Sequence, residues 1–337
     1  MGQGKSLPDI HYVSRLEGNG WDSARAVEIA RAVSFALIPM PDCCASTIKI
    51  PERHGGMMVY EIEDRDSAAP VFGDWEESVI WSCLQGVMGH IYGNKKDRPD
   101  SAMAILGDFC FYAGKPDREL AAYRPEWCTQ DFIIAVPQDF QWGQEIEKHY
   151  KDSARKVTRY AMKKEPDVFG RDRLADLVKA LPDGYTLEPI EEAVYQYCKR
   201  ESWCRDFVSQ FPDYSFYQKA GLGIVAKKDG IPVSGASSYS AYLGGIEIEI
   251  DTKEEYRRKG LALACGARLI LECLHRGLYP SWDAQNLWSV SLAEKLGYHF
   301  DHEYVAYEIS GYGGEKTASG SNNYFCDSPT FIPGCML

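Results

Sequence analysis

An alternating strand, a short basic turn and a long apolar helix follow one another between residues 246 and 276. No other segment constrains the fold as much. Isoleucines alternate with acidic residues up to Thr252, which is the period-two pattern of a β-strand. From Leu261 to Arg276 the apolar residues recur at helical spacing, and Gly277 follows as a glycine that ends a helix. The segment therefore predicts an α/β unit in which a strand leads through a turn into a helix.

The turn has the composition of a site for a diphosphate. Gly260 allows the backbone to approach a ligand closely, and the small Ala262 leaves the first helical turn open. The unbonded N–H groups at a helix start favour an anion, as does the helix dipole. Positive charge is added by Arg257, Arg258 and Lys259. The P-loop and dinucleotide-binding patterns are both missing, and an ordinary basic turn before a surface helix is the alternative.

Hydrophobic patterns predict further elements along the chain. The predicted helices cover residues 21–38, 75–88, 142–160, 171–181, 191–208 and 288–296. The predicted strands cover residues 102–113, 131–136, 185–190, 223–227, 232–242, 280–284 and 298–309. The alternation of both types indicates a mixed α/β fold.

Two motifs in the C-terminal half resemble the signatures of GNAT N-acetyltransferases. The segment Arg257-x-x-Gly260-x-Ala262 matches the R/Q-x-x-G-x-G/A signature. Downstream, Asn286, Ser289 and the run LAEKLGY at 292–298 resemble the second signature, N-x-x-(A/S) followed by EKLGF. Residues 75–309 also resemble a zwittermicin-resistance acetyltransferase-like subgroup with an extra N-terminal domain.

This resemblance implies a C-terminal GNAT fold with a central splayed mixed sheet, preceded by an N-terminal α/β domain. The Pro182-Asp183-Gly184 turn marks the expected boundary. The expected parts are an unassigned segment at 1–60, an N-terminal α/β domain at 61–182, the acetyltransferase domain at 183–310 and a flexible tail at 311–337.

The resemblance also implies acetyl-CoA as co-substrate, bound in the wedge between the strand ending at Thr252 and the strand at 280–284. Main-chain groups of Ile250, Asp251 and Thr252 would pair with the pantetheine arm, which Asn286 and Ser289 would also contact. The amides expected to hold the pyrophosphate are those of Arg258, Lys259, Gly260, Leu261, Ala262 and Leu263.

A base must remove a proton from an amine that attacks the thioester. Glu247, Glu249 and Asp251 share one face of the expected central strand, where burial would raise their pKa values. Glu249 is the first candidate and Glu247 the second. Pairing with Lys or Arg, or binding of a water chain, is the alternative. Asp283 is a candidate for holding a cationic acceptor.

The general acid stays open, because Ala293 stands where many GNAT enzymes have a tyrosine. The candidates are Ser289, Ser291 and Tyr298, and departure of the thiolate without an acid is the alternative, since a thiol has a pKa near ~8.5.

Charge and cysteine usage limit the partners. The formal net charge of −12 is unfavourable for nucleic-acid binding. The 11 cysteines form no CxxC pair, so no metal site is expected, and we expect a reducing, cytoplasmic location. No window of 18 apolar residues and no signal peptide are visible, so no membrane partner is expected.

The sequence thus predicts an acetyl-CoA-dependent N-acetyltransferase that acts on a primary amine of a small molecule by direct attack. Its partners would be acetyl-CoA and the amine, and a homodimer is left open. Two alternatives stand beside this function. One is a non-catalytic acyl-CoA-binding or regulatory module, which Ala293 favours, and the other is a protein N-acetyltransferase.

Overall fold

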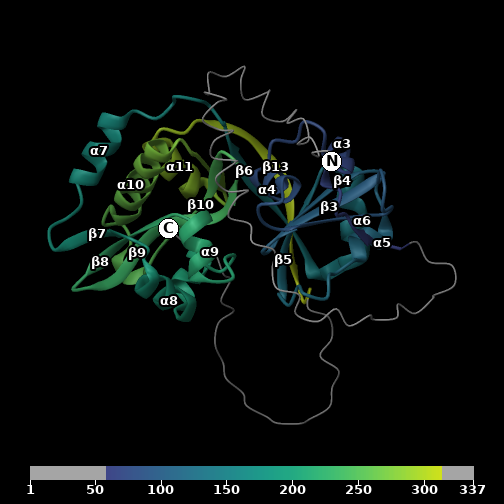
Figure 1. The fold of residues 1–337 in the computed structure, drawn as a ribbon, viewed down its shortest axis with the longest axis horizontal. Helices are drawn as coiled ribbons and strands as arrows, with labels where there is room; N and C mark the ends of the chain where they lie inside the picture. The colour runs from purple at the N-terminus through teal and green to yellow at the C-terminus, as the bar shows by residue number, and fades with distance from the viewer. Residues whose placement is uncertain (1–57, 313–337) are drawn as a thin grey trace, which may run out of the picture. The chain divides into compact units, whose positions relative to one another are not determined.

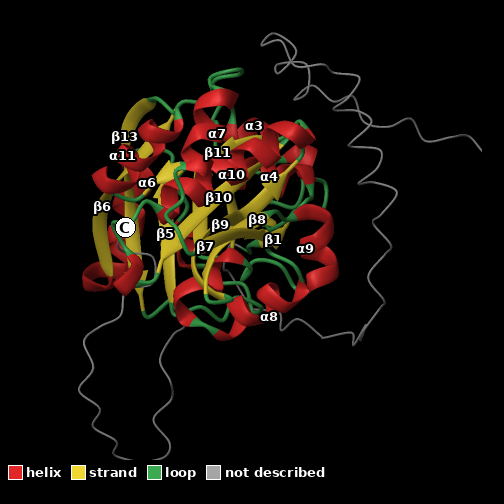
Figure 2. Cartoon of the chain, turned by 90° about the vertical axis from the view of Figure 1, so that its left-hand side faces the viewer, coloured by secondary structure: helices red, strands yellow, loops and turns green. Residues whose placement is uncertain are grey.

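A computed structural model describes residues 58–312 (Figures 1 and 2). Apart from Lys164–Val168, these residues belong to one compact unit, which contains an eight-stranded and a five-stranded sheet. The helix predicted over 21–38 and residues 313–337 of the expected tail lie outside the described residues. The predicted mixed α/β fold is confirmed, because both sheets are mixed and helices pack on them.

The five-stranded sheet has the order β11-β10-β9-β8-β7. Its strands are β7 (Tyr185–Pro189), β8 (Gly223–Lys228), β9 (Ile231–Tyr242), β10 (Gly245–Thr252) and β11 (Tyr279–Ser281). Only β10 and β11 pair in parallel. Strand β10 is therefore an interior strand, as expected for the strand that carries the three carboxylates.

The eight-stranded sheet has the order β1-β2-β3-β4-β5-β13-β6-β12. Its strands are β1 (Tyr60–Glu61), β2 (His90–Gly93), β3 (Ser101–Leu106), β4 (Phe109–Gly114), β5 (Phe132–Pro137), β6 (Ala154–Met162), β12 (Asp283–Ala284) and β13 (Phe300–Ser310). Strands β4 and β5 run in parallel, whereas the other pairs are antiparallel. Two strands from the C-terminal half, β12 and β13, thus belong to the sheet that the N-terminal half begins.

The helices pack on these sheets. The α-helices are α3 (Ala69–Phe72), α4 (Ser78–Gln85), α5 (Arg118–Ala122), α6 (Phe140–Tyr150), α7 (Arg171–Lys179), α8 (Glu192–Arg200), α9 (Tyr214–Ala220), α10 (Leu261–Arg276) and α11 (Leu287–Leu296). The short 3₁₀ helices are η1 (Arg65–Ser67), η2 (Lys151–Ser153), η3 (Ser202–Phe207) and η4 (Glu254–Tyr256). Helix α10 packs on β8, β9 and β10, while α4 contacts β9 of one sheet and β3 of the other.

The face of β10 toward α10 is apolar. A Cβ placed on Gly266 of α10 would lie 3.5 Å from Cδ1 of Ile250. Because side chains alternate along a strand, the carboxylates of Glu249 and Asp251 are directed to the opposite face, where η3 packs on β9 and β10.

Two predicted helices were too long. The helix predicted over 142–160 ends at Tyr150, where Lys151 takes a positive φ of 49°, and residues 154–162 form β6 instead. Pairing with β13 overrides the local helical pattern there. The helix predicted over 191–208 ends at Arg200 and continues as η3.

The other predicted elements include confirmed ones and one strand that differs from its prediction. The strand predicted over 280–284 is two short strands that belong to different sheets. Residues 102–113, where either one strand or a strand pair was expected, form the pair β3 and β4, and the helix from Leu261 to Arg276 is confirmed. Helix α9 and strands β1 and β2 were not predicted.

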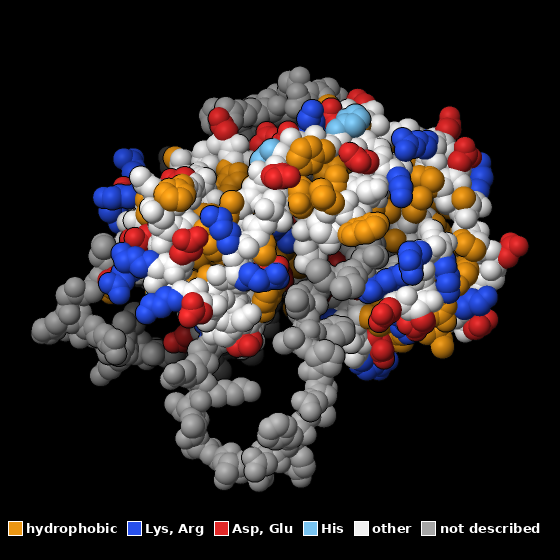
Figure 3. Space-filling model, turned by 180° about the vertical axis from the view of Figure 1, so that it is seen from behind, with side chains coloured by type: hydrophobic (Ala, Val, Ile, Leu, Met, Phe, Trp, Pro, Cys, Tyr) orange, Lys and Arg blue, Asp and Glu red, His pale blue; other side chains and the backbone are white. Residues whose placement is uncertain are grey.

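Trp142 lies at the centre of the core beneath the eight-stranded sheet. Its side chain is fully buried, packs at 5.3 Å from the ring of Tyr112, and donates from Nε1 to the carbonyl of Gly114 at 2.8 Å. The surface is charged where the core is apolar: acidic and basic side chains intermix on the face in Figure 3.

We expect Trp142→Phe to lower the free energy of unfolding by about 1–3 kcal/mol, because it leaves space in the core and removes the donor to Gly114. Urea unfolding measures this loss in stability, provided that the dependence of the unfolding free energy on urea concentration is the same in both proteins. Trp288→Phe is the control, since Trp288 is 76% exposed and should change stability by less than about 0.5 kcal/mol. Equal losses in both variants would contradict the assigned core.

Candidate active site

Strand β10 loses its partner on one side after Glu247. The parallel register with β11 ends at the pair Glu247 and Ser281. The chain then passes Trp282 and forms β12, which pairs with β6 of the other sheet. Within the described residues, the second half of β10 therefore has a strand partner only on the β9 side.

The open side of β10 presents backbone amides. Lys253 N–H donates toward β9, to the carbonyl of Val233 at 2.9 Å. Because alternate residues of a strand direct their N–H groups to opposite sides, the amides of Ile250 and Thr252 face away from β9. The Thr252 amide donates to its neighbour Asp251 at 2.6 Å. On this edge neither amide is bonded to a strand, although the Thr252 amide has a side-chain partner.

Helix α10 begins without a side-chain cap. Gly260 is its N-cap, with a φ of 79°, and the first intrahelical bond runs from Ala264 N–H to the Gly260 carbonyl at 3.1 Å. The amides of residues 261–263 precede that bond and have no carbonyl within the helix to bind. A Cβ on Gly260 would meet no atom within 4 Å, so the space above the turn is open. This is the start that an anion-binding helix needs.

Two of the three basic residues of the turn are held by the turn itself. Arg257 donates from Nε to the carbonyl of Thr252 at 3.1 Å and therefore ties the turn to the end of β10. Lys259 donates to the carbonyl of Glu255 at 2.9 Å. Arg258 is exposed. The positive charge is present at the helix start, while Arg257 also acts as a structural link.

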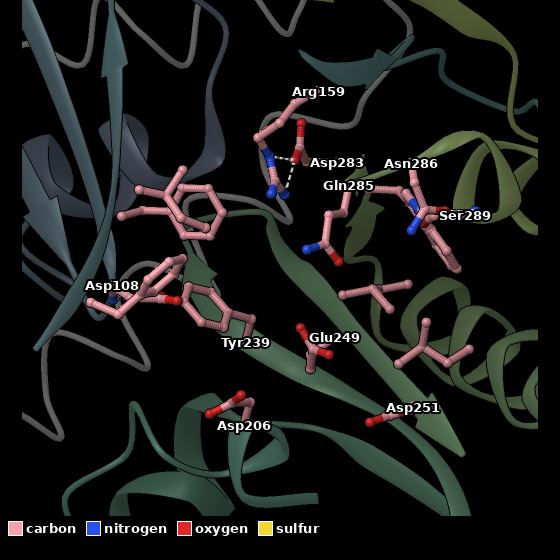
Figure 4. A pocket seen from close by; sticks show the side chains of 16 residues that line it. Asp108, Arg159, Asp206, Tyr239, Glu249, Asp251, Asp283, Gln285, Asn286 and Ser289 are labelled. Atoms are coloured by element: carbon pink, nitrogen blue, oxygen red, sulfur yellow. Dashed lines mark hydrogen bonds and ion pairs between the residues drawn. The ribbon is translucent and has the colours of Figure 1, made fainter. Parts of the chain in front are cut away.

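A cavity of about 120 Å³ lies where the two sheets diverge (Figure 4). Six predicted site residues line it, namely Glu249, Ile250, Asp251, Asp283, Asn286 and Ser289. Other polar residues that line it are Asp108, Arg159, Asp206, Tyr239 and Gln285. The lining therefore comes from both sheets, from η3 and from the segment that follows β11.

Glu249 points into this cavity from β10 (Figure 4). Its pKa is raised well above the usual range, chiefly by burial and then by the negative charges of Asp206, Asp251 and Asp108, while Arg159 opposes the shift. No described side chain donates a hydrogen bond to its carboxylate or forms an ion pair with it. A carboxyl group with a raised pKa holds a proton more readily than an exposed carboxylate, which is the property required of a general base.

Glu247 occupies a different environment. Its carboxylate accepts a hydrogen bond from the Ser78 hydroxyl of α4, and it does not line the cavity. The structure therefore brings the first candidate base to the cavity and leaves the second beside α4.

The Asn286–Ser289 motif forms the start of α11. Asn286 Oδ1 accepts from the Ser289 amide at 3.0 Å, and the Ser289 hydroxyl accepts from Trp282 Nε1 at 3.1 Å. Ser289 lines the cavity. By contrast, Tyr298 is buried and donates to the carbonyl of Pro280 at 2.6 Å. Of the candidate acids, the structure brings Ser289 to the cavity and leaves Ser291 and Tyr298 outside its lining.

Asp283 is held by Arg159. Arg159 is only 6% exposed, donates from Nε to Asp283 Oδ1 at 2.7 Å and lies 4.9 Å over the ring of Phe109. Tyr304 donates to the other carboxylate oxygen at 2.6 Å. Arg159 therefore neutralises the Asp283 carboxylate, which was expected to hold a cationic acceptor.

The sequence did not predict that residues of the N-terminal half, such as Asp108, would line the cavity. Asp108 lies in the β3–β4 turn, donates its amide to Tyr239 Oη at 3.1 Å and accepts from the same hydroxyl. Gly107 makes this approach feasible, because a Cβ there would lie 2.2 Å from Tyr239 Oη. Only a Gly-Asp turn between two apolar strands marked this site, and the pattern does not tell which sheet such a turn will meet.

Within residues 58–312, no group of three or more His, Cys, Asp or Glu residues could hold a metal ion. No helix in that range is long and apolar enough to cross a membrane.

Comparisons with known proteins agree on one family. The sequence profile that describes GNAT acetyltransferases matches residues 69–307. A protein of Bacillus subtilis (strain 168), described as the uncharacterized N-acetyltransferase YdfB, is 30% identical over 246 residues, which cover 68% of this chain and 88% of that protein. The crystal structure of a GCN5-related N-acetyltransferase-like protein from Streptococcus suis 89/1591 superposes with a TM-score of 0.69 at 47% identity, covering 73% of this chain and 98% of that one.

The carboxyl of Asp251 should make stability depend on pH. Burial raises its pKa from 3.8 to about 6. The folded state thus holds this proton more tightly than the unfolded state, so the contribution to stability is present below about pH 4 and is lost as the pH rises through about 6. Asp251→Asn should therefore raise the free energy of unfolding above pH 6 by about 1–3 kcal/mol.

Urea midpoints between pH 4 and 7 measure this gain. Asp183→Asn, at an exposed turn, is the matched control and should follow the wild type at every pH. A loss of stability in Asp251→Asn at pH 7 would contradict the raised pKa.

Proposed function

Because this chain belongs to the GNAT acetyltransferase family, we propose that it transfers an acetyl group from acetyl-CoA to a primary amine of a small molecule. It is an acyltransferase by family, and the GNAT family generally uses acetyl-CoA. The observation that carries the proposal is the divergence of β10 from β11 beside the uncapped start of α10. Those two features present backbone donors to an extended thioester arm and to a diphosphate.

The cofactor would follow the open edge of β10. The amides of Ile250 and Thr252 would pair with the pantetheine arm, and the start of α11 at Asn286 and Ser289 would border it on the other side. The pyrophosphate would bind the amides from Arg258 to Leu263, where the helix dipole and the basic side chains favour it. This arrangement would place the thioester near Glu249, at the boundary between the wedge and the cavity.

The chemistry needs one proton acceptor and one leaving group. Glu249 takes a proton from the amine, whose nitrogen forms a bond to the acetyl carbon while the carbon–sulfur bond breaks. The products are an acetamide and CoA, whose thiolate takes a proton. Ser289 lies beside the cavity to supply it, and a thiolate with a pKa near ~8.5 is also able to leave unassisted. Holding both reactants in this geometry supplies a large part of the rate gain.

The cavity admits a small acceptor. Its walls come from two sheets and from η3, and its volume of about 120 Å³ accommodates a group of a few heavy atoms, whether a small amine or the end of a lysine side chain. Acetylation of a protein lysine or N-terminus is the alternative, and an acceptor panel that includes peptides separates the two.

A non-catalytic acyl-CoA-binding module is the second candidate, because Ala293 replaces the tyrosine of many relatives and is buried. The carboxyl of Glu249 in the cavity favours catalysis instead. Steady-state release of CoA thiol with an amine panel distinguishes the two functions.

We expect Gly260→Asp to weaken acetyl-CoA binding at least about tenfold, because a carboxylate would stand where the diphosphate binds. Isothermal titration calorimetry measures the affinity. Gly230→Asp is a closely matched control, since Gly230 has the same φ of 79° and the same empty surroundings at the β8–β9 turn. Equal affinities in the two variants, or no binding to the wild type at millimolar concentration, would exclude the proposed cofactor site.

Glu249→Gln should lower kcat by about 10²–10⁴-fold and leave acetyl-CoA affinity unchanged, because the base is lost while the cofactor site is intact. In the wild type, kcat/KM should rise as the pH passes the raised pKa of Glu249, since only the carboxylate accepts a proton. This rise should vanish in the variant. Glu247→Gln is the comparison, and a larger loss there would reassign the base.

A further inference from the structure

Three carboxylates from three separate elements line one part of the cavity. Asp108 comes from the β3–β4 turn, Asp206 from η3 and Glu249 from β10. All three are partly buried. In Figure 4, Asn286 and Ser289 lie on one side of Glu249 and Asp108 lies on the other. Asp206 lies below Glu249 in the same view. We call Asp108 and Asp206 the distal carboxylates.

The protein supplies no direct counter-charge to these groups. Among the described residues, no Lys or Arg forms an ion pair with any of the three. Arg159, which also lines the cavity, is committed to Asp283. It acts on Asp108 and Glu249 only at longer range. Asp108 has the Tyr239 hydroxyl, and Asp206 has the Ser209 hydroxyl, as hydrogen-bond partners. Neutral donors of this kind do not balance a negative charge.

The three carboxyl groups repel one another. Burial raises the pKa of Asp108, although Tyr239 and Arg159 oppose this. Burial, followed by the charge of Asp108, raises the pKa of Asp206. The charges of both add to the raised pKa of Glu249. An empty cavity therefore retains protons that a bound cation would displace.

On the face in Figure 3, basic and acidic side chains intermix, whereas the three carboxylates in the cavity have no Lys or Arg ion-pair partner among the described residues. The three groups also do not form a cluster that could hold a metal ion, within residues 58–312. Because the three carboxylates come from three separate elements, a ligand that carries its charge on separated atoms, as an organic diamine does, would match them. The nearby rings of Phe109 and Tyr239, 5.7 Å apart, offer apolar contact to a carbon chain.

We propose that the acceptor is a small dication, whose reacting amine lies at Glu249 and whose second ammonium group is bound by the distal carboxylates. The inference rests on the proposed function and specifies the substrate class. Binding of the second ammonium would fix the position of the reacting amine relative to the thioester, and this kind of positioning raises the rate. The N-terminal half of the chain would thus select the acceptor through Asp108.

Equilibrium binding tests this without relying on turnover. Isothermal titration of the full chain with diamines from 1,3-diaminopropane to 1,6-diaminohexane, with butylamine and with 4-aminobutyrate compares ligands that differ in their second group. We expect one or more diamines to bind at least about tenfold more tightly than butylamine, and 4-aminobutyrate to bind most weakly. Titration in buffers of different ionisation enthalpy should show more protons released per bound diamine than per bound butylamine.

Variants of the distal carboxylates locate the effect. Asp108→Asn and Asp206→Asn should each weaken diamine binding about tenfold and leave butylamine binding unchanged. Asparagine keeps an oxygen that accepts from Tyr239 or Ser209, so the fold is preserved in both variants. Asp183→Asn, on the exposed turn before β7, is the control and should change neither affinity.

Each outcome decides the inference. Equal affinity for diamines and butylamine, no binding of any diamine at millimolar concentration, equal losses for both ligand types in the variants, or tighter binding of Mg²⁺ than of diamines would overturn it. Release of CoA at the same rate with butylamine as with diamines would support the transferase function and contradict the dicationic acceptor. Failure of acetyl-CoA to bind, together with a diamine selectivity that depends on Asp108 and Asp206, would support the dication site and contradict the transferase function.

Discussion

The backbone of β10 gives up its hydrogen-bonding neighbour halfway along its length, and the functional region is organised around that break. Strand β11 leaves after Ser281 because the next residues, β12, pair with β6 in the other sheet. The backbone amides of an interior strand normally donate hydrogen bonds to the strands on both sides. Here the amides of Ile250 and Thr252 on one side have no strand partner, and under the proposed function an extended ligand would take that place. The same departure separates the two sheets and forms the cavity.

The second sheet holds this break open. Arg159 of β6 binds Asp283 of β12, and Tyr304 of β13 binds the other oxygen of the same carboxylate. Both partners are partly or fully buried, so the charges are stabilised by direct hydrogen bonds rather than by water. Across the cavity, the Tyr239 hydroxyl joins β9 to the β3–β4 turn at Asp108. The Tyr239 contact connects the two sheets, whereas the contacts of Asp283 fix β12 within the eight-stranded sheet. The shape of the cavity therefore depends on the N-terminal half as well as on the acetyltransferase signature.

The sequence predicted the parts of the site that are local in the chain. The strand up to Thr252, the turn at Gly260 and the helix to Arg276 are set by consecutive residues, and the structure has all three. The residues that arrive from elsewhere were not predictable, because Asp108 and Asp206 carry no local signal of their destination. The helix predicted through residue 160 failed for the same reason, since β6 forms by pairing with β13, more than a hundred residues later. The expected domain division at residue 182 stays a prediction, and β12 and β13 join the strands on both sides of it into one sheet.

The position of β13 has a consequence for the order in which the chain acquires its structure. Residues 300–310 lie between β5 and β6, so these two strands have no shared partner until the last part of the described chain has been synthesised. A nascent chain that ends before residue 300 would expose the inner edges of both strands, and such edges readily pair with other chains. Completion of this sheet therefore waits until residues 300–310 have been synthesised, and the two edges are open to wrong pairing during the interval.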